Sequence, residues 1–193
     1  MTEHPVINIL GEKVALGPIR RDLMPLYNRW INDFEVLEYM GALQQPMTQE
    51  AEEAWFAQAS RPQETSVDFL IYELPSYRPI GTTDLRNIDF RNRSAQFGII
   101  IGEKDAWSKG YGTEATELML HYAFNDLGLH SVWLTVFSFD PRGIRAYEKA
   151  GFKVVGSQRE AHWAKGRFHD IVIMDCLSKD FDGKGFNRLL SND

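Results

Sequence analysis

The amino-acid sequence predicts an α+β fold. Three β-rich runs lie in the middle of the chain and are separated by short polar connections, which favours an antiparallel meander. Apolar residues with helical spacing occur both before and after these runs. This mixture of meander strands and helices is more typical of an α+β domain than of a doubly wound parallel sheet.

The N-terminal part of the chain is expected to form one strand and three helices. The strand is expected at residues 12–19, and the helices at residues 20–33, 34–40 and 47–60. An apolar face of the first helix is formed by Leu23, Leu26, Tyr27 and Trp30. Pro25 should lie in the first turn of this helix, where the missing N–H costs least. Thr48 is the expected N-cap of the third helix, with Glu50 in its first turn.

The rest of the chain is expected to combine strands with two further helices. The expected elements, in order, are strands at 67–74, 79–89 and 94–102, a helix from about residue 111 to Gly128, a strand at 130–139, a helix from Pro141 to Gly151, and strands near 153–163 and 169–177. Gly98 interrupts the third strand of the meander and predicts a bulge or a close backbone approach. Asp140 and Pro141 are typical of a helix cap and a first turn.

The composition indicates a globular protein and disfavours several function classes. Hydrophobic residues make up 44% of the 193-residue chain, charged residues make up 25%, and the net charge is −6. This acidic balance argues against a nucleic-acid partner, which usually requires a basic face. The lone Cys176 cannot form an internal disulfide, and no Cys or His spacing predicts a metal site. No signal peptide or membrane-spanning run is visible, so we expect no membrane partner and a cytoplasmic location.

The stretch WSKGYGTEA, residues 107–115, places two glycines where a strand is expected to pass into a helix. The first N–H groups of a helix have no partner within the helix and attract anions, and glycines let a phosphate approach the backbone. The stretch lacks the spacing of a P-loop. A dinucleotide fingerprint requires an acidic residue at the end of a second strand about 20 residues later, but here that region lies near the end of the expected helix. Taken alone, the turn fits both a phosphate cradle and a tight connection without a ligand.

A second motif, DPRGIRAYEKAGF at residues 140–152, follows a helix and a strand later. Together with the glycine turn, residues 101–156 resemble the GNAT superfamily of acetyl-CoA-dependent acetyltransferases, and more finely its RimJ/RimL type. The resemblance implies a single domain over residues 1–193, with a mixed, mostly antiparallel central sheet, two splayed parallel strands and flanking helices. It places the CoA-binding core at about 94–156 and the acceptor side at 20–60 and 157–177.

The same resemblance implies acetyl-CoA as co-substrate and no metal. The CoA pyrophosphate would lie on the turn formed by Ser108, Lys109, Gly110, Tyr111, Gly112 and Thr113. The pantetheine arm would insert between strands 96–102 and 132–139 and bond to the backbone of Ile99, Ile100 and Ile101, where an N–H would also stabilise the oxyanion. Asp140 stands where relatives have Asn and would keep the helix cap. Trp107 replaces the usual Gln or Arg, and because the backbone makes the expected contacts, its side chain is expected to matter little.

The resemblance implies one catalytic residue but does not identify the general base. Tyr147 matches the family tyrosine that protonates or hydrogen-bonds the CoA sulfur. The general base is less evident, because many relatives carry Glu where this chain has Gln96, which cannot accept a proton. The carboxylates near the expected site are Glu103, Asp84 and Asp89, and the first two are the predicted catalytic carboxylates.

The acceptor is expected to be a primary amine that binds beside the N-terminal helices and the last hairpin. The predicted contacts are Trp30, Glu35, Glu38 and Tyr39, with Trp163 and His169 as further candidates. At pH 7, deprotonating an amine with a pKa of about 10.4 costs about 4.6 kcal/mol, whereas an α-amine with a pKa of about 7.7–8.0 costs about 1–1.4 kcal/mol. Because no strong base is evident, we expect a protein N-terminal α-amine, of the ribosomal-protein type, or another low-pKa amine.

Several alternatives stay open at this point. A polyamine or an aminoglycoside would also fit an amine acetyltransferase. A non-catalytic acyl-CoA-binding module or a plain structural domain would fit the departures at Trp107, Gln96 and Asp140. Both a monomer and a homodimer are compatible with the resemblance.

Overall fold

A computed structural model describes residues 5–41 and 45–183 of the chain. The strands are β1 (Ile9–Leu10), β2 (Val14–Gly17), β3 (Ser66–Glu73), β4 (Arg78–Asp89), β5 (Ser94–Ile101), β6 (Ser131–Phe137), β7 (Lys153–Ala164) and β8 (Arg167–Leu177). The helices are α1 (Met24–Ile31), α2 (Phe34–Leu37), α3 (Gln49–Ala59), α4 (Tyr111–His121) and α5 (Pro141–Ala150). Short 3-10 turns at Arg21–Leu23 and Lys104–Ala106 precede α1 and α4, and α4 continues as a π-helical turn at Tyr122–Asp126.

The expected order of elements is confirmed, with small differences at the N-terminus. The predicted strand at 12–19 is shorter, and β1 precedes it. Pro25 lies in the first turn of α1. The Thr48 side chain accepts a hydrogen bond from the Ala51 backbone N–H and caps α3. Local periodicity and capping therefore explain where most of these elements begin.

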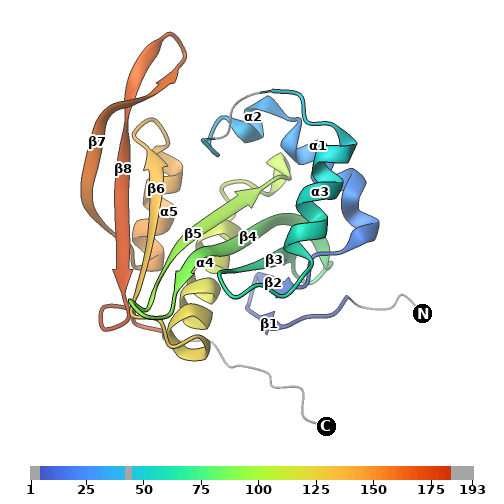
Figure 1. The fold of residues 1–193 in the computed structure, drawn as a ribbon, viewed down its shortest axis with the longest axis horizontal. Helices are drawn as coiled ribbons and strands as arrows, with labels where there is room; N and C mark the ends of the chain where they lie inside the picture. Colours follow the sequence, from blue (N-terminus) through green and yellow to red (C-terminus); the bar gives the residue numbers. More distant parts are fainter. Residues whose placement is uncertain (1–4, 42–44, 184–193) are drawn as a thin grey trace.

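The eight strands of the described residues form one sheet in the order β1-β2-β3-β4-β5-β6-β8-β7 (Figure 1). Every neighbouring pair is antiparallel except β5 and β6, which run parallel. Those two strands pair only from Ser94 to Gln96 on β5, while β5 stays paired with β4 as far as Ile101. The predicted fold class, a mixed and mostly antiparallel sheet with two splayed parallel strands, is confirmed.

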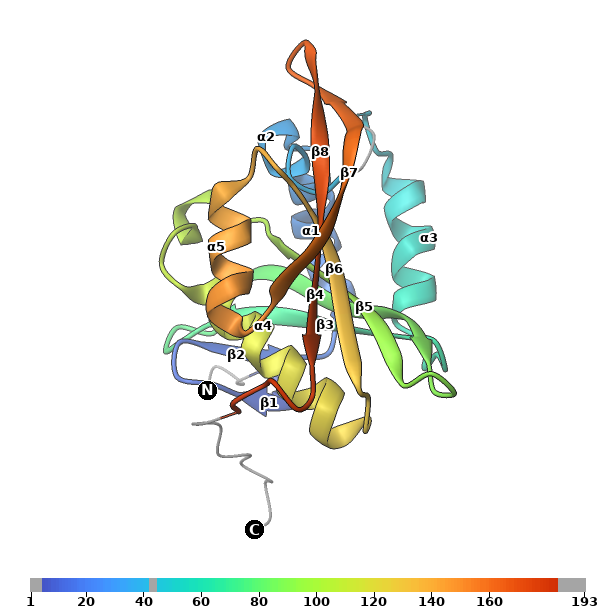
Figure 2. The same ribbon diagram turned by 90° about the vertical axis from the view of Figure 1, so that its left-hand side faces the viewer.

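Helices cover both faces of the sheet (Figure 2). Helices α4 and α5 lie on one face, where Leu118, Met119 and Leu120 of α4 are fully buried in the larger apolar core. Helices α1 and α3 lie on the opposite face, where Tyr27 and Trp30 pack in a second, smaller core. Burial of such side chains is worth about 1.5–3 kcal/mol each, which fixes both helix layers on the sheet.

The glycine turn is held in place by a buried carboxylate. Glu114 lies in the first turn of α4, and its side chain accepts hydrogen bonds from the backbone N–H groups of Glu12 at 2.5 Å and Lys13 at 2.8 Å. A buried carboxylate is stable when backbone donors satisfy it, so this contact ties the start of α4 to the β1–β2 connection. No helix among the described residues is long and apolar enough to cross a membrane.

The expectation of a bulge at Gly98 is wrong. Gly98 is paired in regular register with Asp84, and the irregularity between β4 and β5 lies further along, between Arg86 and Asp89. A Cβ atom built on Gly98 would lie 2.5 Å from Asp84 Oδ1. The missing side chain therefore makes room for a neighbouring carboxylate and not for an irregular backbone.

Candidate active site

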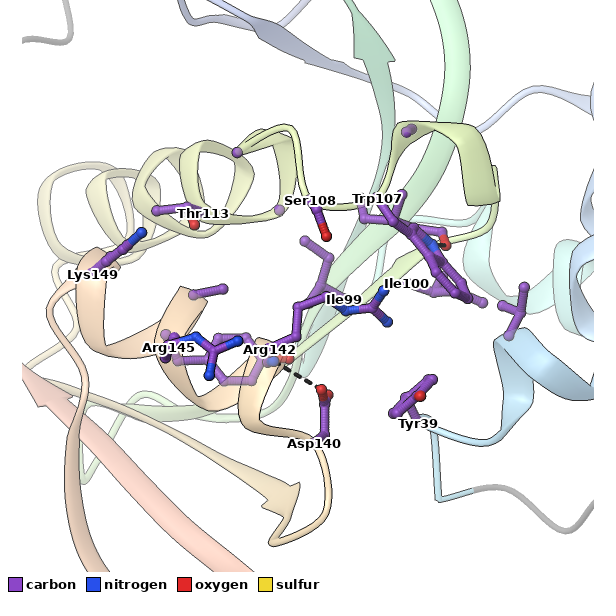
Figure 3. A pocket seen from close by; sticks show the side chains of 18 of the residues that line it. Tyr39, Ile99, Ile100, Trp107, Ser108, Thr113, Asp140, Arg142, Arg145 and Lys149 are labelled. Atoms are coloured by element: carbon purple, nitrogen blue, oxygen red, sulfur yellow. Dashed lines mark hydrogen bonds between the residues drawn. The ribbon is translucent and has the colours of Figure 1, made fainter.

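The splayed strands open into a cavity of about 330 Å³ between the glycine turn, β5 and α5 (Figure 3). Nine of the residues expected at the CoA site line it: Ile99, Ile100, Ile101, Ser108, Gly110, Gly112, Thr113, Asp140 and Tyr147. The fold brings these residues together because β5 ends at the turn and α5 begins on the facing side of the opening. The cavity has both apolar and polar walls, as expected of a site for a long, charged ligand.

Backbone N–H groups at the start of α4 face this cavity. Gly110 is the N-cap residue, adopts a left-handed conformation with φ of 88°, and provides no side-chain cap. Gly112 follows in the first turn, where an added Cβ would meet only Ile101 Cγ1 at 3.8 Å. The bare turn thus leaves the N-terminal donors of an eleven-residue helix accessible to an anion.

Two members of the predicted cradle do not line the cavity with their side chains. The Tyr111 ring packs against the larger core. Lys109 is exposed and lies outside the lining residues. Any role of these two residues is therefore confined to their backbone groups.

Three cations that sequence analysis missed line the cavity from α5. They are Arg142, Arg145 and Lys149, and Figure 3 shows them on the side opposite the glycine turn. Their spacing of i, i+3 and i+7 places them on one helical face. That spacing was visible in the sequence, but only the fold shows that this face is turned toward the turn.

The side chain of Trp107 makes contacts of its own in the site, in addition to those of its backbone. Its indole N–H donates a hydrogen bond of 2.7 Å to the Ile101 carbonyl, so this carbonyl already has a donor. The Arg142 guanidinium lies 4.2 Å from the Trp107 ring centroid and 5.1 Å from that of Tyr39. Such cation–π contacts are worth about 0.5–2 kcal/mol. The expectation that this side chain matters little is not supported by its contacts.

Asp140 caps α5 as expected. It is buried, and its Oδ1 accepts a hydrogen bond of 2.9 Å from the Gly143 backbone N–H. A Cβ atom at Gly143 would collide with the other carboxylate oxygen, so Asp140 and Gly143 fit each other sterically. The cap therefore places a negative charge beside the cavity near the start of α5.

Tyr147 lines this cavity and also a second one of about 310 Å³ on the other side of β5. Its ring packs edge-on against Phe97 and Phe152. Burial, and to a smaller extent the charge of Asp140, raise the pKa of the Tyr147 hydroxyl above its ordinary value. The phenol therefore keeps its proton at neutral pH.

The second cavity lies between the sheet and helices α1 and α3. Its polar walls include Glu52 of α3, Asp68 of β3 and Asp84 of β4, and Arg86 is the cation that lines it within the described residues. Burial raises the pKa of Glu52 and of Asp84. Burial and the charge of Asp84 raise the pKa of Asp68 to about 6. Excess carboxylates in a partly desolvated space favour a cationic ligand.

The predicted acceptor contacts divide into two groups. Trp30 and Tyr39 line the second cavity, and Tyr39 also lines the first. Glu35 instead forms an ion pair with Lys104 at 2.9 Å, and Glu38 forms one with Lys165 at 2.5 Å. Neither of these two glutamates lines either cavity, so their expected direct contact with an acceptor is not supported.

Of the carboxylates considered from the sequence, only one lines a cavity described above. Asp84 lines the second cavity. Glu103 lines neither cavity: it accepts a hydrogen bond of 2.8 Å from the Trp30 indole N–H and pairs with Arg29. Asp89 holds its own turn by accepting a hydrogen bond from the Asn92 backbone N–H. Asp84 is therefore the candidate that the fold brings to the site, and Glu103 has a structural role beside Trp30.

The last hairpin stands away from both cavities. Trp163 is 60% exposed and packs against Phe168 near the hairpin tip (Figure 1). His169 is buried against Phe139, with 4.6 Å between ring centroids. Neither lines a cavity described above. Within residues 5–41 and 45–183, no three His, Cys, Asp or Glu side chains are placed to hold a metal ion.

Comparison with known proteins adds to this geometry. A Vibrio cholerae spermidine N(1)-acetyltransferase is 32% identical over 102 residues, which cover 53% of this chain and 58% of that protein. A Bacillus subtilis protein named "Putative ribosomal N-acetyltransferase YdaF" is 30% identical over 104 residues, which cover 54% of this chain and 56% of that protein. These matches span little more than half the length of the curated relatives.

The fold is similar to that in a crystal structure of spermidine N-acetyltransferase from Vibrio cholerae in complex with CoA and spermine. The TM-score is 0.80 at 23% identity, and the match covers 88% of this chain and 98% of that chain. At this identity the likeness concerns the fold alone. A family model described as an acetyltransferase (GNAT) domain matches residues 13–153, which contain the glycine turn, the splayed strands and α5. The chain therefore belongs to the GNAT acetyltransferase family.

Proposed function

We propose that this protein is an N-acetyltransferase that moves the acetyl group of acetyl-CoA to a primary amine. The observation that carries this proposal is the place of Tyr147, which lines both cavities where they approach each other at β5. One cavity has the anion-attracting turn and the other has the carboxylates. A phosphorylated acyl donor and a cationic acceptor would thus meet beside a phenol that holds its proton.

CoA would bind in the first cavity. The N–H groups of the turn at Gly110 and Gly112 would hold the pyrophosphate. The face of α5 that carries Arg145 and Lys149 would supply cations to the phosphates. The pantetheine arm would lie along Ile99 and Ile100, which have no β6 partner in the ladder. Membership in the GNAT family supports each of these assignments.

The chemistry would be direct attack of the amine on the thioester. The neutral amine forms a bond to the carbonyl carbon, and the developing oxyanion is stabilised by a backbone N–H of β5 near Ile100. The C–S bond then breaks, and the thiolate takes the Tyr147 proton. The amine nitrogen releases its proton to a carboxylate or to solvent, and the phenol is reprotonated.

The acceptor would be a small amine with more than one positive charge. Glu52, Asp68 and Asp84 surround the second cavity and favour such a ligand. The expectation of a low-pKa α-amine depended on the absence of a base, and the carboxylates in the cavity weaken that premise. The resemblance to a spermidine N(1)-acetyltransferase points in the same direction.

A protein N-terminal α-amine is the second candidate acceptor. The resemblance to the Bacillus subtilis protein named for ribosomal acetylation favours it, and it agrees with the RimJ/RimL assignment, which stays a prediction. Steady-state kcat/KM values for spermidine, an aminoglycoside and an N-terminal peptide would decide between these acceptors. We expect spermidine to be preferred; a preference for the peptide would overturn the polyamine assignment, while binding of acetyl-CoA without acetylation of any amine would overturn the enzymatic one.

A further inference from the structure

Asp68 and Asp84 form a pair of opposed carboxylates in the second cavity. The two residues are direct cross-strand partners on β3 and β4, and both line the cavity. Directly opposed residues of an antiparallel pair have Cβ atoms about 4.5–5.5 Å apart and point to the same face. Asp84 is in turn the register partner of Gly98 on β5. The pair thus extends in a row from β3 toward the strand along which the thioester would lie.

Gly98 allows the Asp84 carboxylate to lie over β5. The Asp84 Oδ1 atom is 2.5 Å from the place where a Cβ at Gly98 would be, so any larger residue would displace the carboxylate. Gly98 directly precedes Ile99, which lines both cavities. Asp84 is therefore the carboxylate of the second cavity that lies against β5, next to the residues that would position the acetyl group.

We propose that Asp84 takes the proton from the acceptor ammonium group, and that Asp68 is a positioning residue whose opposed charge makes Asp84 a stronger base. This inference rests on the proposed function. In the step, the ammonium N–H bond breaks and its proton moves to an Asp84 oxygen, while the electron pair stays on nitrogen and forms the N–C bond to the thioester carbonyl. As the C–S bond breaks, the CoA thiolate takes the Tyr147 proton, and the second proton lost by the nitrogen restores the phenol. Asp84 then returns its proton to solvent.

The charges around the pair favour one shared proton. Arg86 on β4 lies 3.7 Å from Asp84 Oδ2 and partly offsets the repulsion. Glu52 of α3, Tyr27 of α1, Tyr39 after α2 and Tyr147 of α5 face the same cavity and supply no further cation. Within the described residues, the Asp68 side chain forms no hydrogen bond or ion pair, and its surroundings act through burial and the charges of Asp84 and Arg86. Two desolvated carboxylates in this arrangement titrate as a coupled unit.

Other carboxylates are less suited to this role. Glu52 is buried on α3, and burial is what raises its pKa. Glu103 is engaged with Trp30 and Arg29 outside the cavities. Gln96 of β5 has a neutral amide that cannot accept a proton. Asp84 thus combines a place at β5, partial desolvation and a charged neighbour.

The test is the pH dependence of kcat/KM with spermidine as acceptor. The amines of spermidine, like a lysine amine, have pKa values of about 10.4, so an inflection on the acid side of neutral pH reports the enzyme. Asp68→Asn removes the repulsive charge and should move this inflection to lower pH, whereas Arg86→Gln removes the attractive charge and should move it to higher pH. Asp89→Asn, which removes a carboxylate from β4 outside both cavities, is the matched control and should leave the inflection in place.

Asp84→Asn should lower kcat by about 10²–10⁴-fold while acetyl-CoA binding is retained. An inflection that stays fixed in both Asp68→Asn and Arg86→Gln would overturn the inference, as would an Asp84→Asn enzyme of near wild-type kcat. Because Arg86→Gln leaves both carboxylates in place, the test does not depend on the folding of the aspartate variants. A wild-type enzyme that binds acetyl-CoA but acetylates no amine would instead refute the proposed function.

Discussion

Tyr147 is the residue on which the proposed acetyl transfer depends most. Its hydroxyl is kept protonated by burial and by the nearby charge of Asp140, and it lies where the two cavities meet. Tyr147→Phe preserves the packing against Phe97 and Phe152 and removes only the hydroxyl. We expect kcat to fall by about 10²-fold or more, because the thiolate loses its proton donor.

The Tyr147→Phe measurement should separate catalysis from binding. Steady-state kinetics should show a KM for acetyl-CoA within about threefold of the wild-type value, since the phenol is proposed to act on the transition state. An unchanged kcat would remove Tyr147 from the mechanism.

Asp68 links the acceptor cavity to the stability of the fold. Its pKa in the folded protein, about 6, lies above its ordinary value of 3.8. The folded state therefore binds a proton more tightly than the unfolded state, and ionisation of Asp68 lowers the free energy of unfolding as pH rises from about 4 to about 6. Asp68→Asn should consequently raise the thermal unfolding midpoint at about pH 7.5, and the gain should shrink below about pH 4.

Asp89 provides the control of opposite sign for this effect. It is the last residue of β4, next to the strand that carries Asp68, and hydrogen bonds from Asn92 lower its pKa. Its contribution to stability is present at neutral pH and is lost as pH falls, so Asp89→Asn should lower the midpoint most at neutral pH. A lower midpoint for Asp68→Asn at neutral pH would contradict the desolvation of Asp68.

At the scale of elements, the glycine turn and α4 form the proposed CoA cradle. Gly112 is the better glycine to substitute in a test of the cradle. It has no positive φ, and an added Cβ would meet only Ile101 at an ordinary contact distance. Gly110 is less informative, since its φ of 88° would add backbone strain to any substitution. Gly112→Leu should raise the KM for acetyl-CoA at least about tenfold, equivalent to about 1.4 kcal/mol, by filling the cradle.

Gly156→Leu is the matched control for this substitution. A Cβ at Gly156 on β7 would meet nothing within 4 Å, and the residue lies outside both cavities. Both variants should unfold near the wild-type midpoint in thermal melts. Wild-type KM for acetyl-CoA in Gly112→Leu would show that the turn does not hold the phosphates.

The elements themselves were largely predictable, because their signals are local. Helical spacing before and after the meander, the Thr48 cap and the Gly151 stop are carried by neighbouring residues. The prediction of a bulge at Gly98 was wrong, because a glycine is needed there to make room for a residue on another strand. A carboxylate 14 positions earlier, Asp84, occupies the space, and single-sequence periodicity carries no information on such contacts.

At the scale of the whole molecule, the fold decides which charged residues reach the site. Glu35, Glu38 and Glu103 looked suitable from their position near the expected site, but each is engaged in an ion pair elsewhere. Asp68 was missed because only the β3–β4 register brings it beside Asp84. Cross-strand register depends on the whole sheet, so this pair could not be foreseen from either segment alone.

The central claim is that two cavities meeting at Tyr147 transfer an acetyl group from CoA to an amine. The most direct test is a single-turnover reaction of the full chain with isotopically labelled acetyl-CoA and spermidine, in which free thiol and the masses of the products are measured together. We predict one labelled acetyl group on spermidine for each thiol released. Thiol release accompanied by labelled acetate, or acetyl-CoA binding with no thiol release above the enzyme-free rate, would contradict the claim.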